Sequence, residues 1–235
     1  YWCHSCVTAL AEAEVEYADH TSTSVFVKFP LDDEAKNKIG ISGTVSAVIW
    51  TTTPWTLPAN VAIAVNRDYE YSIVKINNAD NSNLSAGEYI IVAKEMLENL
   101  AGTFKITGYD EVKILKGSEL EYLNARHPFY ERNSMIVLAD YVTLDAGTGL
   151  VHTAPGHGQD DYETGLRYNL DILSPVDDNG ILRNVGIFDG MHINKANKEI
   201  VAYMQEHGSL LAQNDISHSY PHCWRCKKPV IFRAT

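Results

Sequence analysis

The 235-residue sequence predicts a mixed α/β fold in which a β-rich, barrel-like sheet carries helices at its periphery. Short runs of β-branched and aromatic residues, bounded by Gly, Pro or Asn, recur through the first two-thirds of the chain. Helical spacing of apolar residues is confined to a few separate segments. The sequence contains no internal repeat and no apolar run long enough to cross a bilayer, so we expect no membrane-spanning segment.

Several segments have the composition of β-strands, and the one at 46–50 is continuously apolar, as expected for a strand buried on both faces. The predicted strands cover residues 24–29, 46–50, 61–65, 69–76, 88–93, 104–109, 111–116 and 134–142. Residues 66–68 have the composition of a turn, which predicts a hairpin between the two strands that flank them. Residues 127–130 are expected to form an extended edge.

Helices are predicted where apolar residues recur every three or four positions and a capping residue is near. The predicted helical segments cover residues 94–100, 117–123, 160–168 and 194–208. Residues 7–17 fit either a helix or an extended lead-in, and the polar runs 31–43 and 77–85 are expected to be loops. Gly102 and Gly208 are expected to end the helices before them.

The first candidate site is the stretch 147–162, Gly-Thr-Gly-Leu-Val-His-Thr-Ala-Pro-Gly-His-Gly-Gln-Asp-Asp-Tyr. Its glycines allow backbone turns that side chains would block, and they surround two imidazoles and two adjacent carboxylates. A strand, a glycine-rich loop and a helix start would place Asp161 at the mouth of a site. In the alternative interpretation, Asp160 or Asp161 only caps the helix and His152 is a satisfied core imidazole.

The second candidate site follows the apolar strand and reads Trp-Thr-Thr-Thr-Pro-Trp-Thr-Leu-Pro-Ala-Asn over residues 50–60. Consecutive hydroxyls at a strand end, between prolines that fix the backbone, make a rigid polar rim. Such a rim can hydrogen-bond a ribose, an ester or a water molecule. Alternatively, the threonines are ordinary strand residues and Pro54 and Pro58 only end the strand.

All the cysteines fall in two Cys-x-x-Cys pairs, one near each end of the chain. The four residues are Cys3, Cys6, Cys223 and Cys226. This pattern predicts a closed structural zinc site that would hold the two ends together at a neck, with His4, His218 and His222 as reserve ligands. Reduced thiols, disulfides and a redox pair are the alternatives.

The formal net charge of −11 argues against broad, nonspecific binding of nucleic acid, which needs many Lys and Arg contacts to phosphates. It leaves room for a local contact. A basic cluster near the end of the chain is such a candidate, although a solvated face explains it equally well. Its members are Arg225, Lys227, Lys228 and Arg233. Because the chain starts abruptly at Tyr1, without Met or a leader, we expect a piece of a longer protein.

Residues 50–60 and 147–161 together resemble the editing domain, the connective insertion, of isoleucyl-tRNA synthetases. Residues 2–17 and 222–235 resemble the segments that enter and leave that insertion, so the resemblance covers essentially the whole chain. Valine and leucine enzymes have an edge more like Thr-Thr-Arg-Pro, which favours the isoleucine type here. The nucleotide-binding signatures of the synthetic core are absent, so we expect no aminoacylation by this chain.

The resemblance implies hydrolysis of valine wrongly esterified to the isoleucine tRNA, with valyl-adenylate as a further substrate left open. A synthetic pocket sized for isoleucine rejects a side chain smaller by one methylene only weakly, so a second site must remove the error. The resemblance divides the chain into connecting segments at 1–22 and 215–235 and an editing domain at 23–214. It implies no cofactor for editing, although structural zinc fits.

The resemblance also implies roles for individual residues. Asp161 would hold the substrate α-ammonium group, and His152 would line the amino-acid pocket. The threonines would surround the ester and the terminal adenosine and position the attacking water; they are Thr51, Thr52 and Thr53. Further substrate contacts are expected from Trp50, Asn60, Gly156, His157 and Asp160.

The expected partners are the 3′ acceptor end of the isoleucine tRNA carrying valine and the rest of the parent synthetase, in the cytoplasm, with the chain a monomer. A zinc-dependent hydrolase or deaminase using His152 or His157 is an alternative, but the residue two positions after each is Ala154 or Gln159, where deaminases have Glu. A noncatalytic binding module closed by a zinc knuckle is another. The editing domain of a valine- or leucine-type synthetase is a third.

Overall fold

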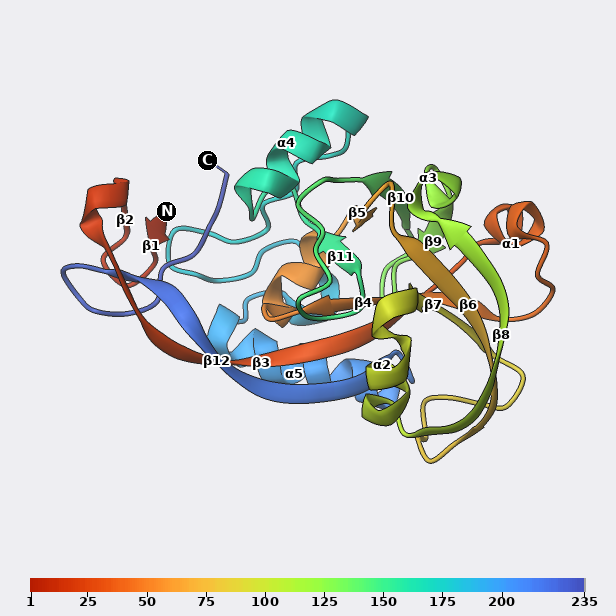
Figure 1. Cartoon of the computed structure of the whole chain (residues 1–235). Coiled ribbons are helices and arrows are strands. Elements are labelled where there is room, and N and C mark those ends of the chain that lie inside the picture. The colour runs from red at the N-terminus through yellow and green to blue at the C-terminus, as the bar shows by residue number, and fades with distance from the viewer. Residues whose placement is uncertain (235) are drawn as a thin grey trace.

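The computed structural model describes residues 1–234, which form one large mixed sheet, a two-stranded sheet and short helices around them (Figure 1). The large sheet contains β3 (Val15–Pro30), β4 (Val45–Thr51), β5 (Ala62–Val65), β6 (Glu70–Ala79), β7 (Tyr89–Ala93), β8 (Ile106–Lys116), β9 (Asn124–Arg126), β10 (Asn133–Leu138), β11 (Leu150–Thr153) and β12 (Leu210–Cys223). The small sheet pairs β1 (Trp2–Cys3) with β2 (Thr8–Ala9).

The helices lie at the periphery, as the sequence predicts. They are α1 (Asp33–Ile39), α2 (Leu97–Thr103), α3 (Gly117–Leu120), α4 (Gln159–Tyr168) and α5 (Ile193–Glu206). Four 3₁₀ turns connect other elements: η1 (Glu12–Glu14), η2 (Pro54–Ala59), η3 (Lys94–Met96) and η4 (Gly186–Phe188).

The large sheet follows the order β8-β6-β7-β4-β11-β5-β10-β9, with β3 paired to β4 and β12 paired to β3. The end of the sheet at β9 lies next to the residues that follow β3. There the Asp32 N–H donates to the Asn124 carbonyl at 3.0 Å, and Leu31 forms a single bridge with Ala125. No continuous ladder closes this gap within residues 1–234. The β-rich α/β prediction is therefore confirmed, whereas closure into a barrel is not.

Hydrophobic side chains fill both faces of the sheet. On β4, Ile49 belongs to the larger core and Val48 to the core on the opposite face, so this strand is buried on both sides, as predicted. Helix α5 covers the larger core through Ile200 and Met204. Helix α2 covers the other face, where Leu100 is one of its buried residues.

Strands β3 and β12 form a long antiparallel ribbon that leaves the body of the domain (Figure 1). Val25 pairs with Thr51 of β4, but the ten residues before it pair only with β12, out to Val15 opposite Cys223. The ribbon leads to the β1–β2 sheet, where Trp2 and Ile231 exchange backbone hydrogen bonds of 2.8 and 2.9 Å. The predicted segment boundaries at 22/23 and 214/215 therefore fall inside continuous strands.

Several local predictions are wrong, for identifiable reasons. The expected loop at 31–43 contains helix α1, because the Asp32 side chain caps it at the Ala35 N–H and Gly40 ends it with a φ of 71°. The expected hairpin does not form, since β5 pairs with β10 and β11 while β6 pairs with β7 and β8.

Smaller differences concern element bounds. Residues 7–17 follow the extended alternative, with β2, η1 and the start of β3. The two strands expected between 104 and 116 are one strand, β8, and Gly102 lies inside α2. The extended edge expected at 127–130 is not a strand; β9 ends before it.

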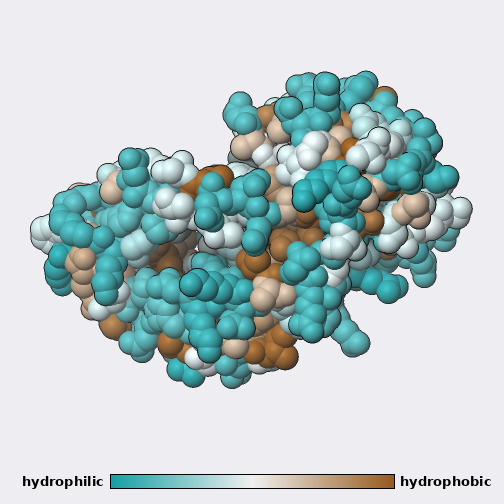
Figure 2. Space-filling view, turned by 90° about the horizontal axis from the view of Figure 1, so that it is seen from below, coloured by the Kyte–Doolittle hydropathy of each residue, from teal (hydrophilic) through white to brown (hydrophobic). Residues whose placement is uncertain are grey.

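None of the helices within residues 1–234 is both long and apolar enough to cross a membrane. The face seen from below in Figure 2 is mostly hydrophilic, and its hydrophobic side chains form small, scattered patches.

Candidate active site

The two predicted site segments meet at one edge of the sheet. Strands β4 and β11 are parallel neighbours, with Trp50 opposite Val151. Because parallel strands end at the same edge, Thr51–Thr53 and Thr153–Ala154 leave the sheet side by side. Pairing thus joins the threonine-rich segment to the glycine-rich segment, which lie far apart in the sequence.

The threonine segment is held by its own hydrogen bonds. The Thr53 N–H donates to the buried Thr51 hydroxyl at 3.1 Å, so Thr51 turns back on the chain. The Thr53 carbonyl accepts bonds from the Thr56 N–H at 3.0 Å and the Thr56 hydroxyl at 2.8 Å. The hydroxyls of Thr52 and Thr53 lie 3.4 Å apart and are only partly buried. The rigid rim that the sequence predicts is therefore present.

His152 lies beneath this rim. Its Nδ1 atom accepts a bond from the Asn60 amide at 2.9 Å, so Nε2 carries the hydrogen and donates it to the Thr56 hydroxyl at 2.9 Å. Burial lowers the pKa of His152 to about 3, which keeps the ring neutral. Both ring nitrogens are occupied by protein groups, and the histidine joins β11 to the threonine segment.

Asn60 completes this buried network. Its side-chain amide also donates to the Ala62 carbonyl at 2.9 Å, and its carbonyl oxygen accepts a bond from Ser134 of β10. The residue is fully buried, and every donor of its amide has a partner. Asn60 therefore connects the threonine segment, β5, β10 and β11.

Asp161 lies in the first turn of α4 and does not cap it; the cap position is Gly158, with no side-chain bond. Its Oδ2 atom accepts the Ala154 N–H at 2.8 Å, and the Tyr141 hydroxyl donates to its Oδ1 atom at 3.3 Å. Burial raises the pKa of this carboxyl group. Among residues 1–234, no basic side chain lies within ion-pair distance of it, so a ligand cation would offset the cost of burying its charge. Its neighbour Asp160 is exposed.

The loop between β11 and α4 packs on the end of the chain. A Cβ atom at Gly156 would lie 2.1 Å from the Leu173 carbonyl oxygen, so only glycine permits this close approach. His157 Nδ1–H donates to the Phe232 carbonyl at 2.9 Å, which leaves Nε2 as a buried acceptor without a partner in the described part of the chain. The His157 ring lies edge-on to Trp55, with centroids 5.0 Å apart, and burial lowers its pKa to about 4.

Trp50 points to the opposite face of the sheet from the larger core. It packs with Phe26, at a centroid distance of 6.4 Å, and lies against Gly147, where an added Cβ atom would come within 3.0 Å of its ring. Trp50 therefore supports the start of the glycine-rich segment.

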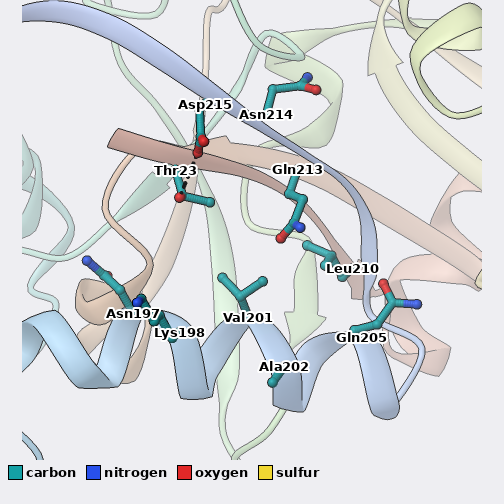
Figure 3. A pocket seen from close by; sticks show the side chains of 10 residues that line it. All are labelled: Thr23, Asn197, Lys198, Val201, Ala202, Gln205, Leu210, Gln213, Asn214 and Asp215. Carbon is teal, nitrogen blue, oxygen red and sulfur yellow. Dashed lines mark hydrogen bonds between the residues drawn. The ribbon is translucent and has the colours of Figure 1, made fainter. Parts of the chain in front are cut away.

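A cavity of about 500 Å³ adjoins the rim, with Thr52, Thr53 and Trp55 among its lining residues. Its other walls come from the ribbon, the start of α5 and the chain ends, and Asp161 is not among its lining residues. A second groove of about 550 Å³ lies between α5 and the ribbon and shares the lining residue Asn197 with the first cavity. Figure 3 shows that this groove is lined by side chains of both elements and that Thr23 bonds Asp215 across the ribbon.

The four cysteines meet as the sequence predicts. Their Sγ atoms all lie within 4.8 Å of one another, with 3.5 Å between those of Cys3 and Cys226, and all four are free thiols. Tetrahedral zinc with bonds of about 2.3 Å holds its sulfurs about 3.8 Å apart, so this donor set fits the metal. Two of the three reserve ligands are engaged elsewhere: His218 bonds Ser22 at 2.9 Å, and His222 bonds the Tyr220 carbonyl at 2.8 Å. The Nδ1 atom of His4 is buried and has no hydrogen-bond partner in the described part of the chain.

Comparison with known proteins identifies the domain. A family model described as "Leucyl-tRNA synthetase, editing domain" matches residues 22–205. The chain belongs to this family of editing domains. Relatives include the isoleucine-tRNA ligases of Lawsonia intracellularis, 52% identical, and Petrotoga mobilis, 55% identical, each over the whole of this chain. The chain spans about a quarter of the length of these relatives (24% in both).

Solved editing domains share the fold. The Plasmodium knowlesi cytosolic leucyl-tRNA synthetase editing domain aligns with a TM-score of 0.62 at 15% identity, over 86% of this chain and 97% of that one. The P. falciparum domain also has a TM-score of 0.62, at 13% identity, over 84% of this chain and 100% of that one. The resemblance to the editing domain of isoleucyl-tRNA synthetases is thus confirmed.

The sequence did not single out three residues that hold this candidate site together. Tyr141, which bonds Asp161, ends a predicted strand, and Thr56, which bonds His152, lies inside the threonine-rich motif. Asn197 of α5 accepts the Trp55 N–H at 2.9 Å, and no local pattern marks it, because α5 reaches the motif only through the tertiary fold.

Proposed function

We propose that this domain hydrolyses the ester of valyl-tRNA(Ile). The observation that carries the proposal is the partly buried Asp161 carboxylate, which has no basic side chain within ion-pair distance among residues 1–234 and follows the strand that ends beside the threonine rim. An α-ammonium group supplies the missing charge. The isoleucine-tRNA ligase relatives support isoleucine tRNA as the carrier.

In the proposed reaction, Asp161 holds the α-ammonium group while Thr52 and Thr53 hold the ester end of the substrate. A water molecule attacks the ester carbonyl carbon, the bond to the ribose oxygen breaks, and the products are free valine and tRNA with both terminal hydroxyls. The neighbouring ribose hydroxyl takes part in the proton transfer. An aminoacyl ester is already activated, so positioning and donors for the developing oxyanion suffice without a protein nucleophile.

His152 has a positioning role in this proposal. Through Thr56 it holds the Thr53 carbonyl, and with it the conformation of the rim. Its side chain backs the amino-acid pocket and does not exchange protons, because the ring is neutral and both nitrogens are bonded.

We further propose that the four cysteines hold one structural zinc ion, and that the remainder of a synthetase delivers the tRNA body to a monomeric domain in the cytoplasm. Four thiolates leave no open coordination position, so the metal would fix the end of the ribbon and take no part in hydrolysis.

The decisive experiment measures deacylation of valyl-tRNA(Ile) and isoleucyl-tRNA(Ile) by the wild type, Asp161→Asn and Asp160→Asn. Asp160→Asn is the matched control, because it removes the same charge from an adjacent side chain that is exposed. The resemblance gives Asp160 as a substrate contact, so this variant also tests that expectation. We expect the wild type and Asp160→Asn to release valine but not isoleucine, and Asp161→Asn to be inactive while still folded. Equal activity of all three proteins would refute the role of Asp161. Binding without turnover by the wild type would instead indicate a noncatalytic module.

A further inference from the structure

Tyr141 is the one side chain in the described part of the chain that hydrogen-bonds the Asp161 carboxylate. Its hydroxyl donates to Oδ1 at 3.3 Å, while the backbone N–H of Ala154 donates to Oδ2 at 2.8 Å. The two donors come from different elements, since Tyr141 follows β10 and Ala154 follows β11. A carboxylate oxygen accepts about two hydrogen bonds, so each oxygen has one protein donor and keeps room for a ligand.

The Tyr141 hydroxyl is a fixed and lasting donor. The ring packs against the small aliphatic core on β5 and β10, whose members include Ala62, Ala64 and Val137. This packing fixes the direction from which the hydroxyl approaches Asp161. Burial raises the pKa of Tyr141, and the charge of Asp161 raises it further, so the hydroxyl keeps its hydrogen near neutral pH.

The other groups that act on Asp161 disfavour its charge or leave it unchanged. Burial raises the pKa of Asp161, and the charge of Asp160 on the same helix raises it further. The bonds from Ala154 and Tyr141 lower it, because they stabilise the ionised form. His157, in the loop before α4, is neutral near pH 7, since burial lowers its pKa to about 4. With no basic side chain of the described chain within ion-pair distance, the two donors keep the carboxyl group ionised before a ligand arrives.

We infer that Tyr141 is a positioning residue, which holds the Asp161 carboxylate ionised and oriented to receive the α-ammonium group of the substrate. The inference rests on the proposed function, because it takes that group as the ligand of Asp161. Without the Tyr141 hydroxyl, Oδ1 has no donor from the described chain. A carboxyl group that takes up a proton as a result no longer attracts a cation.

The first test is the pH dependence of valyl-tRNA(Ile) deacylation by the wild type, Tyr141→Phe and Tyr168→Phe. Tyr168→Phe is the matched control, because Tyr168 also donates to a carboxylate, Glu121 Oε1 at 2.6 Å, which is not part of the candidate site. We expect Tyr141→Phe to move the acid limb of kcat/KM upward by about 1 pH unit, the usual effect of one hydrogen bond to a charged group. Its activity should be about tenfold lower at a pH below both limbs, with a smaller loss above them. Tyr168→Phe should leave the limb in place.

The second test does not depend on catalysis. The NMR resonance of the Asp161 carboxyl carbon in the full chain reports its ionisation, and its absence from Asp161→Asn assigns it. We expect its titration midpoint to rise by about 1 pH unit in Tyr141→Phe and to stay constant in Tyr168→Phe. A tyrosine with only a structural role would lower the urea midpoint of unfolding and move neither the resonance nor the acid limb.

Two results would overturn the inference. One is an Asp161 titration midpoint that is the same in the wild type and Tyr141→Phe. The other is a Tyr141→Phe protein whose activity falls equally at every pH, because the tyrosine would then only support the fold. If the wild type hydrolyses the ester but the Asp161 midpoint ignores Tyr141, only the inference fails. If the midpoint depends on Tyr141 but even the wild type hydrolyses no ester, the proposed function fails while the effect of Tyr141 on the carboxylate stands.

Discussion

Replacing Asn60 by Ala should destabilise the domain more than its position in a turn suggests. The substitution removes three buried hydrogen bonds: the one to the Ala62 carbonyl, the one to the His152 Nδ1 atom and the one from the Ser134 hydroxyl. It leaves the His152 Nδ1 atom and the Ser134 hydroxyl unpaired, and a buried polar group left unpaired costs about 1–3 kcal/mol, so the loss should be at least about 2 kcal/mol. That is a large share of a total stability of about 5–15 kcal/mol.

Urea unfolding followed by circular dichroism measures this loss. With a slope of about 2–3 kcal/mol per molar urea, the midpoint should fall by about 0.7 M or more. The control is Asn77→Ala, which removes an exposed bond to Asp110 of 3.1 Å and should cost less than about 0.5 kcal/mol. Ser134→Ala alone should cost less than Asn60→Ala, because it removes one of the three bonds. If Asn60→Ala and Asn77→Ala unfold at the same urea concentration, the network does not hold the rim.

Three further predictions concern acid, metal and backbone. Burial lowers the pKa values of His127, His152 and His157 to about 3, 3 and 4, below the value of about 6.5 in the unfolded chain. Their neutral folded forms therefore contribute stability that is fully present above pH 6.5 and is lost as the pH falls toward 4. The free energy of unfolding should fall by up to about 1.4 kcal/mol per pH unit for each group. Urea midpoints that stay constant between pH 7 and pH 4 would contradict this prediction. Cys226→Ser should remove the zinc measured by elemental analysis but leave valine release intact, and parallel loss of both would show that the metal does more than hold the ribbon. Gly156→Ala should lower the melting temperature, because its Cβ atom would lie 2.1 Å from the Leu173 carbonyl oxygen. Gly102→Ala in α2, whose Cβ atom would have no atom within 4 Å, should instead raise the stability by about 0.5–1 kcal/mol. If Gly156→Ala proved more stable than Gly102→Ala, the close approach at Gly156 would be refuted.

Local patterns predicted the parts of this fold whose signals are local. The apolar run at 46–50 became β4, and the apolar spacing at 194–208 became α5. Helix α1 was missed although its signals, the capping Asp32 and the terminating Gly40, are present in the sequence. Its polar composition hid them.

Pairing between distant segments could not be predicted in the same way. Strands β5 and β6 are separated by a turn sequence and both contribute buried aliphatic side chains, so composition alone does not reveal that β5 pairs with β10 and β11. The site follows the same rule. Sequence motifs indicated both segments of the site, yet the contacts of His152 with Thr56 and Asn60 arise only where β11 meets the threonine segment.

The length of the ribbon of β3 and β12 sets the distance between the cysteine cluster and the threonine rim. The rim is attached near Val25, and the cysteine cluster begins at Cys223 opposite Val15, so the number of residue pairs between them fixes how far the cluster stands from the rim. Adding one residue to each strand would turn the ribbon side chains beyond the insertion to the other face, whereas adding two would keep the faces and move the cluster by about 6.6 Å. Any ligand that contacted both the threonine segment and the cysteine cluster would therefore need a length that matches this ribbon.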